Sequence, residues 1–122
     1  MRILAADDEA DVRLLLELAL AMHPDVSLTT VSSGRDAVAR AIADRYDLIV
    51  LDGLMPDLDG AATCRLLKGD PRTADVPVVF LTALTSDSAR AELRAAGAAG
   101  FVAKPFDPFT LAAELTAFTT RP

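Results

Sequence analysis

The sequence has little of what a secreted or nucleic-acid-binding protein needs. It has one cysteine, Cys64, so no internal disulfide can form, which is typical of proteins from a reducing compartment. Basic residues are in deficit: 12 Lys and Arg stand against 18 Asp and Glu, and the net charge is −6. Binding to a nucleic-acid backbone requires a basic face, so we expect no direct nucleic-acid binding by this domain.

Long apolar runs are also lacking. No stretch approaches the ~20 residues of a membrane-spanning helix, so we expect no membrane insertion. The N-terminal residues do not resemble a secretory signal, and we expect a cytoplasmic protein. Of the 122 residues, 52% are hydrophobic and 25% charged, which predicts one globular domain over residues 1–122.

Short apolar runs alternate with helical patterns along the whole chain, which indicates βαβ units and a parallel sheet. We therefore expect the α/β class, with a single doubly wound (βα)5 domain of flavodoxin-like topology and strand order 2-1-3-4-5. The predicted strands span residues 2–6, 26–31, 47–51, 77–81 and 100–103. The predicted helices span residues 10–22, 34–45, 59–68, 86–96 and 107–119.

Local signals predict how two of these helices begin or end. Asp107 is expected to cap the fifth helix, and Gly97 to follow the end of the fourth. Leu93 is the only large apolar residue of the fourth helix, so we expect that helix to pack weakly. Cys64 is interpreted as a small, partly buried residue of the third helix.

In the first helix, the core stripe is predicted to centre on Val12, Leu16 and Ala19. Leu14 and Leu18 then fall away from the core. Two interpretations of them stay open: scattered exposed leucines of the usual kind, or a docking surface for a partner protein.

Four of the five predicted strands run into a polar or charged side chain, and these are Asp7-Asp8, Asp52, Thr82 and Lys104. Since the carboxyl ends of parallel strands meet at one edge of the sheet, we expect these side chains to lie together. Clustered carboxylates repel one another unless a cation compensates, and Mg²⁺ prefers oxygen ligands. An aspartate can act as a nucleophile toward phosphorus, and an ammonium and a hydroxyl can stabilise the transferred group. The edge therefore predicts a metal-assisted phosphoryl acceptor.

Four segments together resemble the response regulator receiver domain, the CheY-like phosphoacceptor module of two-component signalling. They occur in the order typical of that family and span the whole chain. The segments are residues 3–9, ILAADDE; 47–56 with 59–60, DLIVLDGLMP and DG; 76–83, VPVVFLTA; and 97–106, GAAGFVAKPF.

This resemblance implies a metal site and a phosphoacceptor. Asp52 would be the phosphorylated residue. Asp8, Asp52 and the backbone carbonyl of Leu54 would ligate Mg²⁺ directly, whereas Asp7 would act mainly through a metal-bound water.

The resemblance also implies a switch. Lys104 would bind the phosphoryl oxygens, and its bond to Pro105 would be cis, which is uncommon for an X–Pro bond. Thr82 and Phe101 would be the switch pair, in which the hydroxyl binds the phosphoryl group and the ring moves. For Phe101, an ordinary place in the core is compatible with that role.

The implied partners are a histidine kinase or a histidine phosphotransfer protein, which would supply the phosphoryl group in a phosphorelay. The fourth helix, fifth strand and fifth helix would form the face that controls an output partner or domain, which the sequence does not identify. A phosphorylation-dependent homodimer is a further option. We expect a signalling switch that promotes only its own phosphorylation and dephosphorylation, and not an enzyme.

Three other classes of protein fit the sequence less well. A phosphatase with an aspartate nucleophile commonly needs a second Asp two residues further on, where this chain has Leu54. A receiver that serves only as a binding scaffold would be expected to lack site residues that are present here. A nucleotide-binding α/β domain would need a Gly-rich loop after the first strand, which is missing.

Overall fold

The computed structural model describes residues 1–53, 55, 58–83 and 86–119. Its sheet has the strand order β2-β1-β3-β4-β5, and every neighbouring pair is parallel, which confirms the predicted topology. Two strands are displaced by one residue from their predicted bounds, so that each ends on a polar side chain. The strands are β1 (Arg2–Ala6), β2 (Ser27–Val31), β3 (Leu48–Asp52), β4 (Val78–Thr82) and β5 (Gly100–Ala103).

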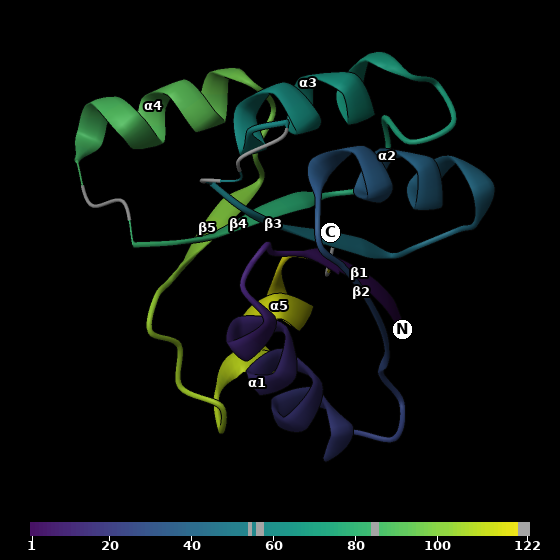
Figure 1. Cartoon of the computed structure of the whole chain (residues 1–122), viewed down its shortest axis with the longest axis vertical. Helices are drawn as coiled ribbons and strands as arrows, with labels where there is room; N and C mark the ends of the chain where they lie inside the picture. The colour runs from purple at the N-terminus through teal and green to yellow at the C-terminus, as the bar shows by residue number, and fades with distance from the viewer. Residues whose placement is uncertain (54, 56–57, 84–85, 120–122) are drawn as a thin grey trace.

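The helices cover both faces of the sheet, as Figure 1 shows: α1 and α5 lie on one face, and α2, α3 and α4 lie on the other. They are α1 (Ala10–Ala21), α2 (Gly34–Ala43), α3 (Gly60–Gly69), α4 (Asp87–Ala95) and α5 (Leu111–Ala117). Each face has its own hydrophobic cluster, because successive strand residues point to opposite faces. In β1, Ile3 packs with the α1 and α5 residues, whereas Leu4 packs with those of α2, α3 and α4.

The start of α5 differs from the prediction by four residues. Asp107 caps a turn that precedes the helix: its Oδ1 accepts a hydrogen bond of 2.8 Å from the backbone N–H of Phe109. The Asp107 carbonyl accepts a bond of 3.0 Å from the N–H of Leu111, where the regular helix begins. Asp107 therefore stabilises the turn that leads into α5, whereas the N-cap residue of the helix itself is Thr110.

The core stripe of α1 is close to the predicted one. Leu16 and Ala19 are buried as expected, and Leu20 is buried with them, while Val12 is only partly buried. Leu14 and Leu18 are 54% and 59% exposed, as their positions on the helix predicted.

Helix α4 is weakly packed, as predicted. Leu93 is its only buried residue among those described, and its N-terminus is capped by the Ser86 hydroxyl. Gly97 follows the C-cap residue Ala96 with a φ of +113°, a conformation that glycine adopts without strain.

Among the described residues, no helix has both the length and the apolar character needed to cross a membrane.

Candidate functional site at the carboxyl edge of the sheet

The structure brings the predicted site residues to one edge of the sheet. Asp7 follows β1, Asp52 is the last residue of β3, Thr82 is the last residue of β4, and Lys104 follows β5. The backbone N–H of Lys104 donates a hydrogen bond of 3.0 Å to the carbonyl of Thr82, which extends the β4–β5 pairing into the site. Residues almost a hundred positions apart therefore become neighbours because parallel strands end together.

A glycine allows α3 to start close to the phosphoacceptor position predicted for Asp52. A Cβ on Gly60 would lie 2.7 Å from the Asp52 carbonyl oxygen and 2.6 Å from the Phe80 ring, which is too close for any side chain. Asp59 caps the same helix end by accepting a bond of 2.8 Å from the N–H of Ala62. The Asp59-Gly60 pair thus fixes α3 against the end of β3.

Lys104 pairs with the carboxylates of the site. Its Nζ lies 3.0 Å from Asp7 Oδ2, 3.4 Å from Asp52 Oδ1 and 3.9 Å from Glu9 Oε1. The Asp7 and Asp52 side chains are only 2% and 8% exposed, so their charges are poorly hydrated. Burial by itself lowers the pKa of Lys104, but the Asp7 and Asp52 carboxylates outweigh it and raise the pKa above its usual value. The ammonium is therefore held in its charged form.

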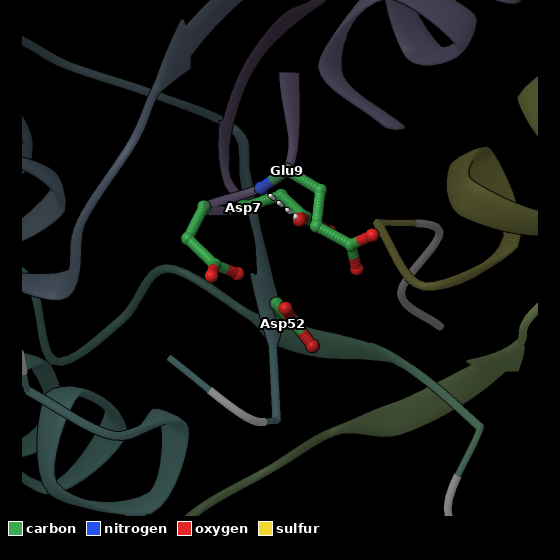
Figure 2. A group of neighbouring side chains, drawn as sticks. Asp7, Glu9 and Asp52 are labelled. Carbon is green, nitrogen blue, oxygen red and sulfur yellow. Dashed lines mark hydrogen bonds between the residues drawn. The ribbon is translucent and has the colours of Figure 1, made fainter. Parts of the chain in front are cut away.

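Four carboxylates gather around this point. Asp7, Asp8, Glu9 and Asp52 each offer an oxygen atom within 4.8 Å of the others, and Figure 2 shows three of these side chains at the ends of β1 and β3. Asp7 Oδ1 accepts a hydrogen bond of 2.9 Å from the N–H of Glu9. Asp7 Oδ2 is buried and, in the part of the chain that the structure describes, has its ion pair with Lys104 but no hydrogen bond.

This donor set fits a hard divalent cation. Four carboxylates bear more negative charge than one lysine compensates, and Mg²⁺ binds one or two carboxylates and keeps several waters. A buried carboxylate oxygen without a hydrogen bond is a suitable acceptor for a metal-bound water. Asp8 is exposed and accessible to an ion. The carbonyl of Leu54, the predicted third ligand, lies outside the described residues.

Sequence reasoning missed two residues at this edge. Glu9 joins the carboxylate group, and the signal was its place in the acidic run that begins at Asp7. Arg13 donates from Nη1 to the Asp7 carbonyl at 2.7 Å. That contact joins α1 to the end of β1, and no local pattern in the sequence distinguishes Arg13 from a surface arginine.

The predicted switch pair occupies neighbouring strands. Thr82 is 3% exposed, and Phe101 is partly buried, with its ring stacked on Phe80 at a centroid distance of 6.4 Å and an angle of 29°. Arg90 and Arg94 of α4 place their guanidinium carbons 5.5 and 5.0 Å from the centre of the Phe101 ring. These two arginines were not predicted, although their four-residue spacing puts them on one helix face.

Two smaller predictions have definite outcomes. The Lys104–Pro105 peptide bond is cis, as expected. Cys64 was expected to be partly buried, but it is completely buried. It lies on the side of α3 that faces the sheet, in a cluster that also contains residues of α2. Burial raises the pKa of its thiol.

The strand order and this edge define the class of CheY-like α/β domains, and comparison with known proteins gives the family. The chain belongs to the response regulator receiver domain family, whose sequence model matches residues 3–116. It is therefore a receiver domain of the kind found in two-component response regulators.

Two curated relatives illustrate the similarity. The chain is 43% identical to the response regulator PleD of Caulobacter vibrioides over 119 residues, which are 97% of this chain and 26% of that protein. It is 35% identical to the transcriptional regulatory protein ResD of Bacillus subtilis over 88% of this chain and 43% of that protein. The chain thus spans only about a quarter to under half of the length of these relatives.

Solved structures agree closely. A putative response regulator from Chloroflexus aurantiacus superposes with a TM-score of 0.90 at 30% identity, covering 98% of both chains. Chemotaxis protein CheY4 of Vibrio cholerae gives 0.89 at 31% identity, covering 96% of this chain and 97% of that one. The receiver domain of sensor histidine kinase PA1611 from Pseudomonas aeruginosa, solved with a magnesium ion coordinated in its active-site cleft, gives 0.87 at 30% identity over 97% and 96%.

Proposed function

We propose that this receiver domain is a phosphorylation switch in which Asp52 accepts a phosphoryl group from a phosphohistidine. The observation that carries the proposal is the position of Lys104 Nζ, 3.4 Å from Asp52 Oδ1 and 3.0 Å from Asp7 Oδ2. A buried carboxylate beside a fixed ammonium suits a nucleophile whose product carries additional negative charge, and the neighbouring carboxylates would hold the divalent cation that offsets the rest. The donor would be a histidine kinase or a histidine phosphotransfer protein.

In the proposed reaction, an Asp52 carboxylate oxygen attacks phosphorus, the phosphorus–nitrogen bond of the donor breaks, and the imidazole leaves. Lys104 then pairs with a phosphoryl oxygen, and the Thr82 hydroxyl donates to another. Mg²⁺, when bound by Asp8, Asp52 and the Leu54 carbonyl with Asp7 reached through a water, would neutralise charge on the transferring group. Glu9 adds a further carboxylate to that charge balance.

The protein would act on itself and would not turn over a substrate, so we do not assign it enzyme activity. Phosphorylation adds strong acceptor oxygens next to Thr82 and Lys104, and this shifts an equilibrium between two conformations. The face built from α4, β5 and α5 would report that shift to the output partner or domain.

The direct test uses acetyl phosphate and Mg²⁺ as phosphoryl donor and cofactor. Wild type should gain the mass of one phosphoryl group, whereas Asp52→Ala should gain none. Asp75→Ala, which removes an exposed carboxylate at the other end of the sheet, is the matched control and should react as wild type does. Sizing of the same samples shows whether phosphorylation creates a homodimer. Phosphorylation of Asp52→Ala to the wild-type extent would refute the assignment.

The exposed leucines of α1 provide the proposed kinase docking surface. Leu14→Glu with Leu18→Glu should leave phosphorylation by acetyl phosphate unchanged but reduce transfer from the cognate kinase about tenfold or more, since charged side chains would have to be desolvated in the complex. Leu66→Glu on α3, whose leucine is 52% exposed, is the control at a remote site. Unchanged kinase transfer in the double variant would show that docking occurs elsewhere.

A further inference from the structure

Two arginines of α4 lie against the ring of Phe101, and the phosphoryl chemistry proposed above does not use them. The guanidinium carbons of Arg90 and Arg94 are 5.5 and 5.0 Å from the ring centre, within the range of a cation–π attraction. The same ring stacks on Phe80, its direct neighbour in the β4–β5 register. Phe101 is thus contacted both by the sheet and by α4.

This contact matters because α4 has few others. Among the described residues, Leu93 is the only buried side chain within the helix, and Ala96 is buried just after it. Arg90 and Arg94 are one helical turn apart, so both can reach a single ring. The contacts of Arg90 and Arg94 with the Phe101 ring therefore add to the packing that Leu93 and Ala96 provide.

We propose that Arg90 and Arg94 are positioning residues that hold the Phe101 ring in its resting position and so oppose the change driven by phosphorylation. This proposal rests on the proposed function, in which Phe101 moves. In the structure Lys104 pairs with the Asp52 carboxylate, and we take the ring position found beside this pair as the resting one. A ring that leaves the two guanidinium groups loses their attraction, and each arginine therefore favours the resting form by roughly two- to fivefold.

The variants Arg90→Met, Arg94→Met and their combination remove the cation but keep an unbranched side chain. Arg90→Lys and Arg94→Lys keep a cation and should retain part of the effect. Arg65→Met is the matched control, because it removes one exposed positive charge from α3, away from the Phe101 ring.

The first measurement follows the ring in the unmodified protein by ¹⁹F NMR after labelling with fluorophenylalanine. The Phe101 signal is identified by its loss in Phe101→Leu. It should shift in the methionine variants, shift less in the lysine variants, and stay in place in Arg65→Met.

The second measurement titrates beryllofluoride, a mimic of the phosphoryl group, in the presence of Mg²⁺. The concentration for half-saturation should fall roughly two- to fivefold for each arginine replaced by methionine, and by about the product of the two effects in the double variant. The control should bind as wild type does.

Each alternative result has a distinct meaning. An unshifted Phe101 signal in the double variant would overturn the contact, and a shifted signal with unchanged beryllofluoride binding would overturn its role in the switch. If the wild-type protein does not bind beryllofluoride, both the proposed function and the role of the arginines are refuted. If wild type binds and the methionine variants bind equally well, only the proposal for Arg90 and Arg94 is refuted.

Discussion

Two partly buried lysines lie at opposite ends of the sheet, and their partners differ in kind. Lys68, near the end of α3, donates from Nζ to the carbonyls of Ala74 and Val76 at 3.1 and 2.7 Å, just before β4 begins. Lys104, just after β5 ends, instead pairs with carboxylates. The contacts that the structure describes thus join one ammonium to backbone carbonyls and the other to ionisable side chains.

Under the proposed function, this difference separates a structural cation, Lys68, from a functional one, Lys104. Backbone carbonyls are uncharged and do not titrate, so the two hydrogen bonds of Lys68 serve to hold the segment between α3 and β4 in place. Its stem passes close to Gly97, where an added Cβ would lie 2.7 Å from Lys68 Cγ. In the proposed function, the carboxylates around Lys104 would also bind a metal ion and Lys104 would pair with the phosphoryl group, so its pairing could be exchanged.

The largest effect expected from this comparison is on phosphoryl transfer. Lys104→Met should lower the rate of phosphorylation by acetyl phosphate about 10- to 100-fold, because a fixed positive charge next to the transferring group is lost. Intact mass recorded over time measures that rate. Lys68→Met should react at the wild-type rate, and an equal loss in the two variants would remove the distinction between the lysines.

A smaller effect, on the stability of the fold, is expected when Lys68 and not Lys104 is replaced. Lys68→Met should lower the free energy of unfolding by about 1–3 kcal/mol, since two backbone carbonyls lose a charged donor. Urea unfolding of wild type and variant, followed by circular dichroism, measures it. A change of only a few tenths of a kcal/mol would mean that water replaces the ammonium without cost.

The smallest expected effect is the pH dependence of stability at alkaline pH. The carboxylates raise the pKa of Lys104 in the folded protein above the unfolded value of 10.5. Its stabilising contribution is therefore fully present below pH 10.5 and is lost as the pH rises through the higher folded pKa. Lys104→Met should show a shallower loss of stability above pH 10.5 than wild type in urea unfolding, and an identical slope would show that this pKa is not raised.

The sequence was most informative where the pattern was local or the spacing regular. Continuous apolar runs such as Leu48–Leu51 predicted buried parallel strands, and their polar ends predicted which edge would carry Asp52 and Thr82. The start of α5 was predicted less well. Asp107 carries a cap signal, yet Thr110 is the observed flanking residue, because a short turn lies between them.

The sequence by itself determined the order of strands and helices and the identity of the residues at the strand ends, since periodicity and chain order are properties of neighbouring residues. Only the tertiary structure decided that Lys104 pairs with both Asp7 and Asp52, that Glu9 joins their group, and that Arg90 and Arg94 meet Phe101. Those contacts depend on strand register and on the way each helix packs, and both are set by the burial of the whole apolar surface at once.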